Sequence, residues 1–462
     1  MISCPNCNGN LKFDIALQKL HCSFCDSAFD PYAFDEKDKD GIENTYETTI
    51  FTCPECAGEI ESTDTDVTGF CPFCGASTIF YSRLSNEKKP DYVIPFKLTK
   101  EDCKNAYDKR TSKLLFLPKE FKNSKYIDGF RGIYVPYWAY DISQEGPLDV
   151  KGKETHRSGD YLITKHYRLT GDMDNFYNGV SYDASSSFSD DISERIAPFD
   201  VHQKQKFTAG FLSGFYADTA DVSEKIYEND ALAFATRTTT GEINKVTEFK
   251  NLEIEIPKDG NYNGKVSKVS RVLFPVWFMS YRNNDAIAYA TINAQTGKVS
   301  ADFPIDVKKF FGFSAVLALV LFMILNLIFT FKPTTLSIIT AVLAVIALVC
   351  YLVEQSNINN RKDLMNDRGY LNAVHPKRTG KKNGKKVEGT YNMIPIISCI
   401  IAIVMSAIMA ITGSIHDEIH YIVNSISAIL VAVTLVYLIL DYNRLIMRPL
   451  PQFQKKGGDD AA

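Results

Sequence analysis

The sequence contains little that points to catalysis. Its 462 residues include only two tryptophans and seven histidines. The hydrolase motif GxSxG, the metalloprotease motif HExxH, the Walker phosphate loop and the dinucleotide fingerprint are all missing. His156, His166 and His202 are scattered and share no fixed spacing with a partner. We therefore expect a protein that is not an enzyme and has no catalytic residues.

An excess of either charge is also missing, because 51 Lys and Arg face 55 Asp and Glu, a net charge of −4. Residues 1–89 hold seven basic and fifteen acidic residues, a balance of −8. Binding to nucleic acid normally needs basic residues that replace phosphate counterions. Nucleic acid is therefore an unlikely partner of this segment, although zinc ribbons in general often bind it.

Cysteine, in contrast, is abundant and regularly spaced. Two copies of a paired C-x-x-C pattern lie 49 residues apart, with 14 residues between the pairs of each copy. Four thiolates in this spacing suit one tetrahedral Zn²⁺ in a closed, structural site. The sequence predicts two structural zinc ions, held by Cys4, Cys7, Cys22 and Cys25 in the first ribbon and by Cys53, Cys56, Cys71 and Cys74 in the second. Gly58 and Gly75 follow two of the pairs, where a tight turn favours a positive φ.

A disulfide framework is the alternative for these eight cysteines. The first residues leave no room for a charged region and an apolar region, so we expect no cleavable signal peptide. If this end lies in the cytosol, its thiols stay reduced. Zinc is the better interpretation.

The middle of the chain, residues 90–306, reads as a strand-rich α+β domain. Thr99 and Asp102 form a capping box before a predicted helix that ends near Leu115, with Cys103 on its buried side. A second helix is predicted over 222–234, opened by Asp221, and a hairpin over 286–303 with Gly297 in its turn.

Both tryptophans lie in similar strand motifs, each with a proline two residues before the tryptophan. The likeness suggests an internal duplication, with each proline at a sheet edge or a bulge. Trp138 and Trp277 are either core residues or the lining of a weak ligand or peptide site.

The last third of the chain is strongly apolar. Four runs without charged residues are long enough to cross a hydrocarbon core of ~30 Å, namely 312–331, 335–353, 394–412 and 419–440. A soluble bundle of helices would show polar faces, and these runs show none. The predicted interior polar groups are Asn326, Asn424 and a few hydroxyls, and His420 is expected in an exposed loop with His416, Asp417 and Glu418.

The loop 354–390 carries nine basic and four acidic residues, which places it in the cytosol by the positive-inside rule. Both termini are then cytosolic, and Arg444 and Arg448 after the last span agree. Six basic residues of this loop are a weak candidate for contact with anionic lipid: Lys377, Arg378, Lys381, Lys382, Lys385 and Lys386.

The cysteine motifs CPNC…CSFC and CPEC…CPFCG are followed by 89–96 (KPDYVIPF), 135–138 (VPYW) and 293–298 (NAQTGK). Together they resemble a bacterial membrane-protein family that contains transcription factor IIB-type zinc ribbons. The resemblance implies zinc and a membrane location, and it implies no activity. Asp26 departs from the pattern, because it stands where the usual knuckle has glycine.

The predicted organisation is multidomain: two small zinc ribbons, an α+β domain and a four-helix transmembrane region. The ranges are 1–34 for the first ribbon, 35–49 for a charged linker, 50–83 for the second ribbon, 90–306 for the α+β domain, 354–390 for the basic loop and 441–462 for a tail. The expected function is a cytosolic-face platform that docks another protein at the lipid bilayer. The alternatives are a nucleic-acid-binding membrane protein and a transporter with a regulatory ribbon domain.

Overall fold

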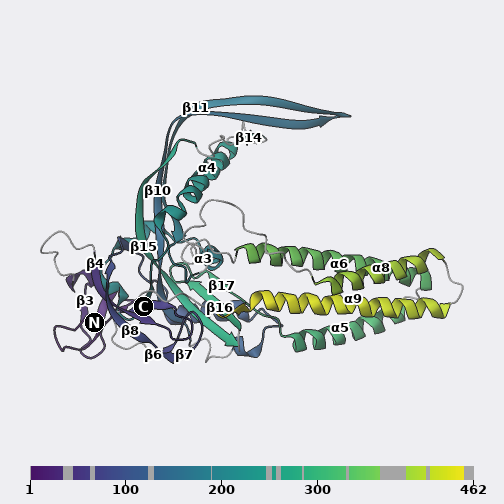
Figure 1. Ribbon diagram of the computed structural model, residues 1–462, viewed down its shortest axis with the longest axis horizontal. Helices are drawn as coiled ribbons and strands as arrows, with labels where there is room; N and C mark the ends of the chain where they lie inside the picture. Colours follow the sequence, from purple (N-terminus) through teal and green to yellow (C-terminus); the bar gives the residue numbers. More distant parts are fainter. Residues whose placement is uncertain are drawn as a thin grey trace, which may run out of the picture.

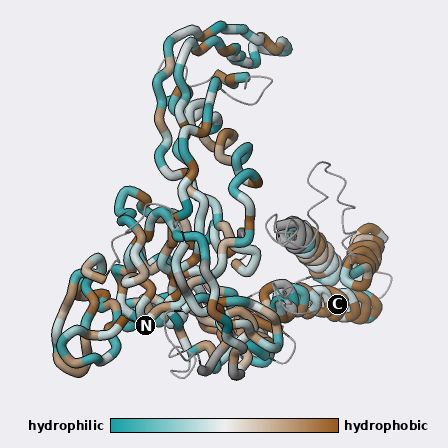
Figure 2. The backbone as a smooth tube through the Cα atoms, turned by 60° about the vertical axis from the view of Figure 1, so that its left-hand side comes forward, coloured by the Kyte–Doolittle hydropathy of each residue, from teal (hydrophilic) through white to brown (hydrophobic). Residues whose placement is uncertain are grey.

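The computed structural model describes residues 2–34, 45–62, 68–122, 129–188, 190–245, 252–255, 262–283, 286–328, 332–364, 392–412 and 417–451. A strand-rich body carries the two cysteine clusters, and four long apolar helices project from one side of it (Figure 1). Figure 2 shows the same division by hydropathy, because the projecting helices are mostly hydrophobic while the body is mixed.

The two ribbons join the body in different ways. The first ribbon forms a separate sheet of β1 (Leu11–Asp14), β2 (Lys19–Cys22) and β3 (Ala28–Phe29), followed by the turn η1 (Pro31–Phe34). The second contains β4 (Thr45–Thr52), β5 (Glu59–Ser62), β6 (Thr68–Phe70), β7 (Ser77–Ile79) and β8 (Tyr81–Lys88). Its strands β4, β5 and β8 belong to the main sheet, because β5 pairs with β13 of the body.

The main sheet has the order β12-β9-β15-β10-β13-β5-β4-β8. Its body strands are β9 (Tyr92–Val93), β10 (Arg131–Ser158), β11 (Tyr161–Asp183), β12 (Gln205–Lys206), β13 (Tyr216–Asp218), β14 (Glu253–Glu255), β15 (Gly264–Asn283), β16 (Ala286–Asn293) and β17 (Val299–Ala301). The helices around it are α1 (Lys100–Thr111), α3 (Asp190–Ile196) and α4 (Glu228–Lys245), with short 3₁₀ turns η2 (Lys119–Lys122), η3 (Val201–Gln203), η4 (Ala209–Leu212) and η5 (Glu224–Ile226).

Several local predictions are confirmed. Thr99 and Asp102 form the capping box of α1, and Cys103 is fully buried. Burial raises the pKa of the Cys103 thiol to about 12, as expected of a core residue rather than a nucleophile. The helix predicted over 222–234 is displaced, because η5 comes first and α4 starts at Glu228. Asp221 does not cap it, since its carboxylate accepts hydrogen bonds from Ser186.

The two prolines of the tryptophan motifs lie neither at a sheet edge nor at a bulge. Pro136 of β10 falls between the ladder with β13, which ends at Tyr134, and the ladder with β11, which starts at Tyr137. Pro275 of β15 falls between the ladders with β9 and β16 in the same way. Proline has no backbone N–H to donate, but at these two positions the neighbouring strand on this side forms no ladder, so no hydrogen bond between strands is lost there. This likeness covers only the strands around the prolines, so a duplication of the whole domain is not shown.

Strands β10 and β11 continue far beyond the body as a two-stranded arm (Figure 1). Its inner part is covered by Leu252, Ile254, Tyr262 and Ile243 of α4, in a cluster that includes Val150 and Leu169. Every residue from 155 to 168 is exposed. The sequence analysis did not predict this arm.

The membrane part consists of α5 (Val307–Ile328), α6 (Pro333–Leu364), α8 (Met393–Thr412) and α9 (Asp417–Ile446), and each contains a candidate membrane span. The number and order of the spans agree with the sequence prediction. The helices are longer than the predicted runs: α6 extends into the expected loop, and α9 extends into the expected tail. A short strand β18 (Arg448–Pro449) then returns to pair with β16.

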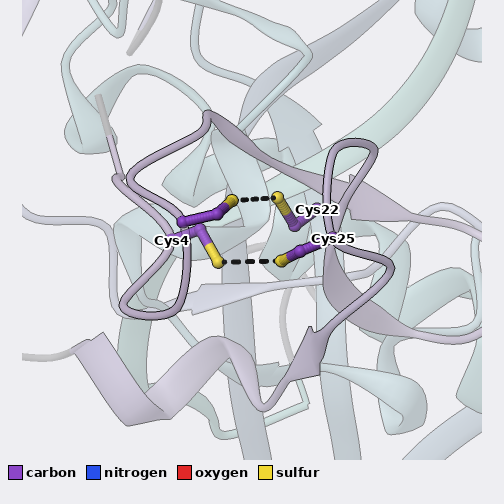
Figure 3. Close-up of side chains that lie close together, drawn as sticks. Cys4, Cys22 and Cys25 are labelled. Carbon is purple, nitrogen blue, oxygen red and sulfur yellow. Dashed lines mark hydrogen bonds between the residues drawn. The ribbon is translucent and has the colours of Figure 1, made fainter.

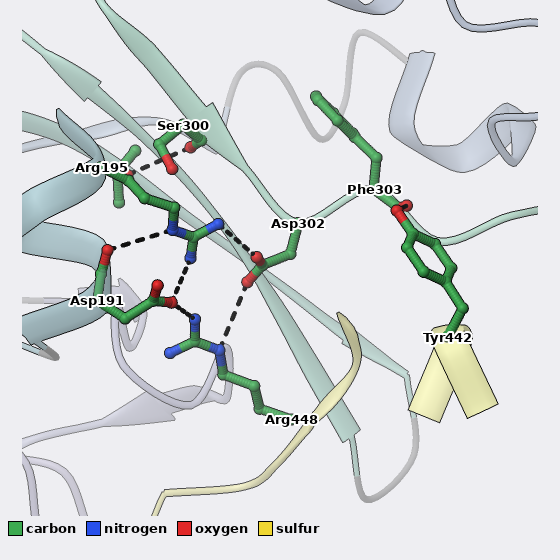
Figure 4. Close-up of polar contacts among 8 residues, drawn as sticks. Asp191, Arg195, Ser300, Asp302, Phe303, Tyr442 and Arg448 are labelled. Atoms are coloured by element: carbon green, nitrogen blue, oxygen red, sulfur yellow. Dashed lines mark hydrogen bonds and ion pairs between the residues drawn. The ribbon is translucent and has the colours of Figure 1, made fainter. Parts of the chain in front are cut away.

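A buried ion network joins the end of the chain to the body (Figure 4). The guanidinium of Arg448 lies 2.8 Å from Asp191 and 3.6 Å from Asp302, and Arg195 reaches both carboxylates at 3.0 Å. Asn443 of α9 exchanges two 2.8 Å hydrogen bonds with the backbone of Ile305. Arg448 is 8% exposed, and it ties the membrane part to the body.

Candidate metal centres

Four backbone knuckles of the same design present the eight cysteines. In each, the residue after the second cysteine donates its N–H to the carbonyl of the residue four before it, at 2.8–2.9 Å. That residue has a positive φ in all four knuckles, at Asn8 (59°), Asp26 (60°), Ala57 (58°) and Gly75 (69°). The turn therefore needs the left-handed conformation directly after the cysteine, at Ala57 rather than at the predicted Gly58. Asp26 adopts nearly the same φ as Gly75, its counterpart in the second ribbon, so its knuckle has the same left-handed turn.

The sulfur atoms of each ribbon converge on one point. All four lie within 4.8 Å of one another in both clusters. In the second ribbon the Sγ–Sγ distances are 3.7 Å for Cys53–Cys74 and 3.8 Å for Cys56–Cys71. A tetrahedron with Zn–S bonds of about 2.3 Å has edges of about 3.8 Å, so the cluster has the size that Zn²⁺ requires. The sulfurs are far too widely separated for disulfides.

The first cluster has the same arrangement, with Sγ–Sγ distances of 3.5 Å for Cys4–Cys25 and 3.4 Å for Cys7–Cys22. Figure 3 shows the sulfur atoms of the two knuckles turned toward one another. Each ribbon can therefore hold one metal ion, and four thiolates in a tetrahedron fit zinc, as predicted. A saturated site of this kind stabilises a fold and leaves no open position for substrate.

The second centre is part of the body's packing. All four of its cysteines are buried. Ser280 of β15 donates to the Cys71 carbonyl at 3.3 Å, and Tyr289 of β16 donates to the Phe73 carbonyl at 2.6 Å. Hydrogen bonding with the neighbouring sulfurs favours the protonated thiol of Cys71 and, followed by burial, raises its pKa. Metal binding must displace that proton, so the affinity of this site for zinc rises with pH.

The first centre is half open. Cys4 and Cys22 are buried beside Leu11 and Leu20 in the main core cluster, whereas Cys7 and Cys25 are exposed. Phe24, between the two cysteines of the second knuckle, is 80% exposed. The ribbon is attached through its inner face, where Ser213 donates to the Leu11 carbonyl at 2.5 Å.

The sequence analysis did not identify Glu61, a buried acidic residue in strand β5 of the second ribbon. Glu61 of β5 is 6% exposed and accepts a hydrogen bond from the Tyr46 hydroxyl. Burial raises the pKa of Glu61 to about 7, although the nearby Arg271 opposes the shift. Its burial follows from the pairing of β5 with β13, which no local pattern indicates.

The other candidate residues are not brought together. Trp138 donates to the Val222 carbonyl at 2.8 Å and Trp277 to the Leu98 carbonyl at 2.9 Å, each within a different cluster. The six basic residues of 377–386 lie outside the described residues. His420 is buried between helices and not exposed in a loop as predicted.

Comparison with known proteins gives one distant similarity. The chain is 25% identical over 308 residues to the uncharacterized protein YdjG of Bacillus subtilis (strain 168), which covers 66% of this chain and 89% of that protein. No family model matches the chain, and no solved structure matches it. The class that fold and site define is a protein with four candidate membrane helices and two four-cysteine metal sites.

Proposed function

We propose that this chain is a non-catalytic docking platform for another protein at the cytosolic face of a membrane. In this proposal both clusters hold structural zinc in ribbons of the transcription factor IIB type. The termini and the body are cytosolic, because the 354–390 loop has a charge balance of +5. The observation that carries the proposal is the uncovered arm of β10 and β11.

The arm has an apolar face with no cover among the described residues. Side chains alternate along β11, so Tyr161, Ile163, Lys165, Tyr167 and Leu169 share one face. Leu169 is buried in the body, whereas Tyr161, Ile163 and Tyr167 are 78%, 41% and 39% exposed. Apart from Lys165, the apolar stripe that begins at Leu169 therefore continues out along the arm, where a partner can cover it.

The arm also has a free edge. Within the described part of the chain, β11 forms a ladder with β10 alone. An isolated two-stranded ribbon is marginally stable in water, and a long free edge is a template for another strand. Residues 151–168 carry five basic and two acidic residues, a balance of +3. These features suit a protein that adds an extended, acidic strand to the edge of β11.

The test places a photo-crosslinking amino acid at Tyr161 of the full-length protein in its native cell, with the same group at the exposed Leu84 as control. A single protein should be crosslinked from position 161 and not from 84. The purified partner should then bind the triple variant Tyr161→Ser, Ile163→Ser, Tyr167→Ser at least about tenfold more weakly than the wild type.

The double variant Leu84→Ser, Leu115→Ser is the matched control, since both side chains are exposed outside the arm. It should bind normally. Equal binding of the partner to the wild type and to the triple variant would exclude the arm as the docking surface.

A further inference from the structure

The helices α6, α8 and α9 form a bundle with an interior unlike that of a hydrophobic core. Most of the buried side chains are polar or small: Ser337, Thr340, Ala344, Ala347, Tyr351, Gln355, Ser398, Cys399, Ala402, Ser406, His420, Asn424, Ser427 and Thr434. Large apolar side chains such as Leu343 and Ile346 point outward. On α9 the polar residues recur with helical spacing, and the apolar Val431 and Leu438 lie on the same face between them.

At the end of the bundle far from the body, three polar side chains meet. Ser337 Oγ lies 3.3 Å from His420 Nδ1 and accepts a hydrogen bond from Asn424 Nδ2 at 3.1 Å. His420 is fully buried and Asn424 is 4% exposed. The Nε2 atom of His420 and the Oδ1 atom of Asn424 have no hydrogen-bond partner among the described residues. Such atoms are costly in a hydrocarbon environment.

The register of the antiparallel helices α8 and α9 defines which polar side chains face one another further along the bundle. The Cys399 sulfur lies 3.2 Å from the Thr434 hydroxyl. Two helical turns further from the body, the same register places Ser406 opposite Ser427. Both are fully buried, and both hydroxyl oxygens lack a partner among the described residues. Between these two levels the register places Ala402 of α8 opposite Val431 of α9, which is half-buried.

At the end near the body, the polar line reaches a carboxylate. Asp441 accepts a 2.9 Å hydrogen bond from Gln355 and a 3.4 Å hydrogen bond from Tyr351, and its carboxylate lies 3.7 Å from the Arg444 guanidinium. Asp441 is 21 residues after His420 on one helix, which is about 30 Å at about 1.5 Å per residue. That length equals the ~30 Å hydrocarbon thickness, so one ionisable group stands at each end of the polar line.

We propose that the interior of this bundle conducts protons across the membrane between His420 and Asp441. His420 Nε2 takes a proton from a water molecule that enters the bundle at the far end, and the ring becomes an imidazolium. It passes the proton to a chain of water and hydroxyl groups at Ser406, Ser427 and Thr434. The Asp441 carboxylate accepts the proton and releases it to water on the body side. One proton leaves for each that enters, and the proton gradient drives the flow.

The side chains favour a proton over other ions. Asn424 Oδ1 can only accept hydrogen bonds, which disfavours an anion. A divalent cation such as Ca²⁺ or Mg²⁺ would require carboxylate ligands. The four bundle atoms described above as lacking a hydrogen-bond partner, on Ser406, His420, Asn424 and Ser427, include no carboxylate oxygen. His420, Ser427, Thr434 and Asp441 follow one another at intervals of seven residues on α9, which is about 10 Å per interval. Two or three water molecules must therefore bridge each interval, as in other proton-conducting chains of His and Asp in membranes.

The test uses the full-length protein in liposomes that contain a trapped pH-sensitive dye, with valinomycin and potassium to remove the membrane potential. The wild type should dissipate an imposed pH gradient at least about tenfold faster than protein-free liposomes. His420→Gln, which keeps a side chain able to reach Ser337, and Asp441→Asn should both return the rate to that of protein-free liposomes. Cys350→Ala, at an exposed position of α6, should retain the wild-type rate.

Gel filtration and zinc content establish that each variant is folded. If His420→Gln does not fold, the double variant Ser406→Ala, Ser427→Ala replaces it, and its rate should also fall to the protein-free value. A wild-type rate no faster than that of protein-free liposomes would overturn the proposal, as would a folded His420→Gln protein at the wild-type rate. In either case the polar interior serves only to hold the helices together.

Discussion

The two ribbons share one sequence pattern and one knuckle geometry, and they differ in what surrounds them. Phe24 and Phe73 occupy the same position between paired cysteines, yet they are 80% and 3% exposed. The second ribbon shares the main sheet and has four buried thiolates, whereas the first has its own sheet and two exposed thiolates. The same metal motif therefore serves as a core element in one copy and as a half-open surface in the other.

The largest difference is expected when one zinc site is removed. With zinc bound at both clusters as proposed, Cys71→Ser should release one ion and destabilise the body by about 4 kcal/mol or more, because the strands of the second ribbon continue into the main sheet. Cys22→Ser should also release one ion but leave the body folded. Zinc content by mass spectrometry and thermal unfolding of the detergent-solubilised protein provide the measurement. A lower midpoint for Cys22→Ser than for Cys71→Ser would contradict the comparison.

The two equivalent phenylalanines give the next test. Phe73→Ala should lower the free energy of unfolding by about 3–5 kcal/mol, because it leaves a cavity in a packed cluster. Phe24→Ala should change it by less than about 0.5 kcal/mol, since that ring is in solvent. Denaturant unfolding followed by tryptophan fluorescence measures both. Equal losses would show that Phe24 is packed in solution.

Glu61 makes the second ribbon sensitive to pH. The pKa of the Glu61 carboxyl is 4.5 in the unfolded chain and about 7 in the folded protein. The folded state thus binds more protons in this window, so its stability falls as pH rises from 4.5 to 7, by about 3 kcal/mol. Glu61→Gln should flatten this part of the stability curve. The counterpart Lys12→Gln, in the first ribbon, should leave the slope unchanged.

The smallest effect concerns the turn residue of the knuckles. Ala57 holds a φ of 58°, which costs a residue with a β-carbon about 1–2 kcal/mol. Ala57→Gly should therefore stabilise the protein by about 0.5–1 kcal/mol after the larger entropy of unfolded glycine is included. Asn8→Gly, at the matched position, should change little because asparagine tolerates this conformation. The thermal unfolding midpoints of the two variants distinguish these outcomes. A loss of stability in Ala57→Gly would show that the backbone at Ala57 is not strained.

Local chemistry made parts of this structure predictable from residues alone. The spacing of the cysteines predicted two clusters of four, because a C-x-x-C turn brings both sulfurs to one metal whatever the rest of the fold does. The capping box at Thr99 and the four apolar runs depend on neighbours in the sequence, and the structure has them where expected. The start of the helix predicted over 222–234 was misplaced, because its starting signal at Asp221 is used in a tertiary contact with Ser186 and α4 begins at Glu228.

The sequence by itself determined which atoms can bind metal and which segments can cross a bilayer, since thiolate spacing and apolar length act within single segments. Only the tertiary structure decided that one ribbon is buried and the other open. It also decided that His420 lies inside a bundle and that β10 and β11 extend past the body. Each of these depends on which distant segment packs against a side chain, and neither composition nor periodicity carries that information.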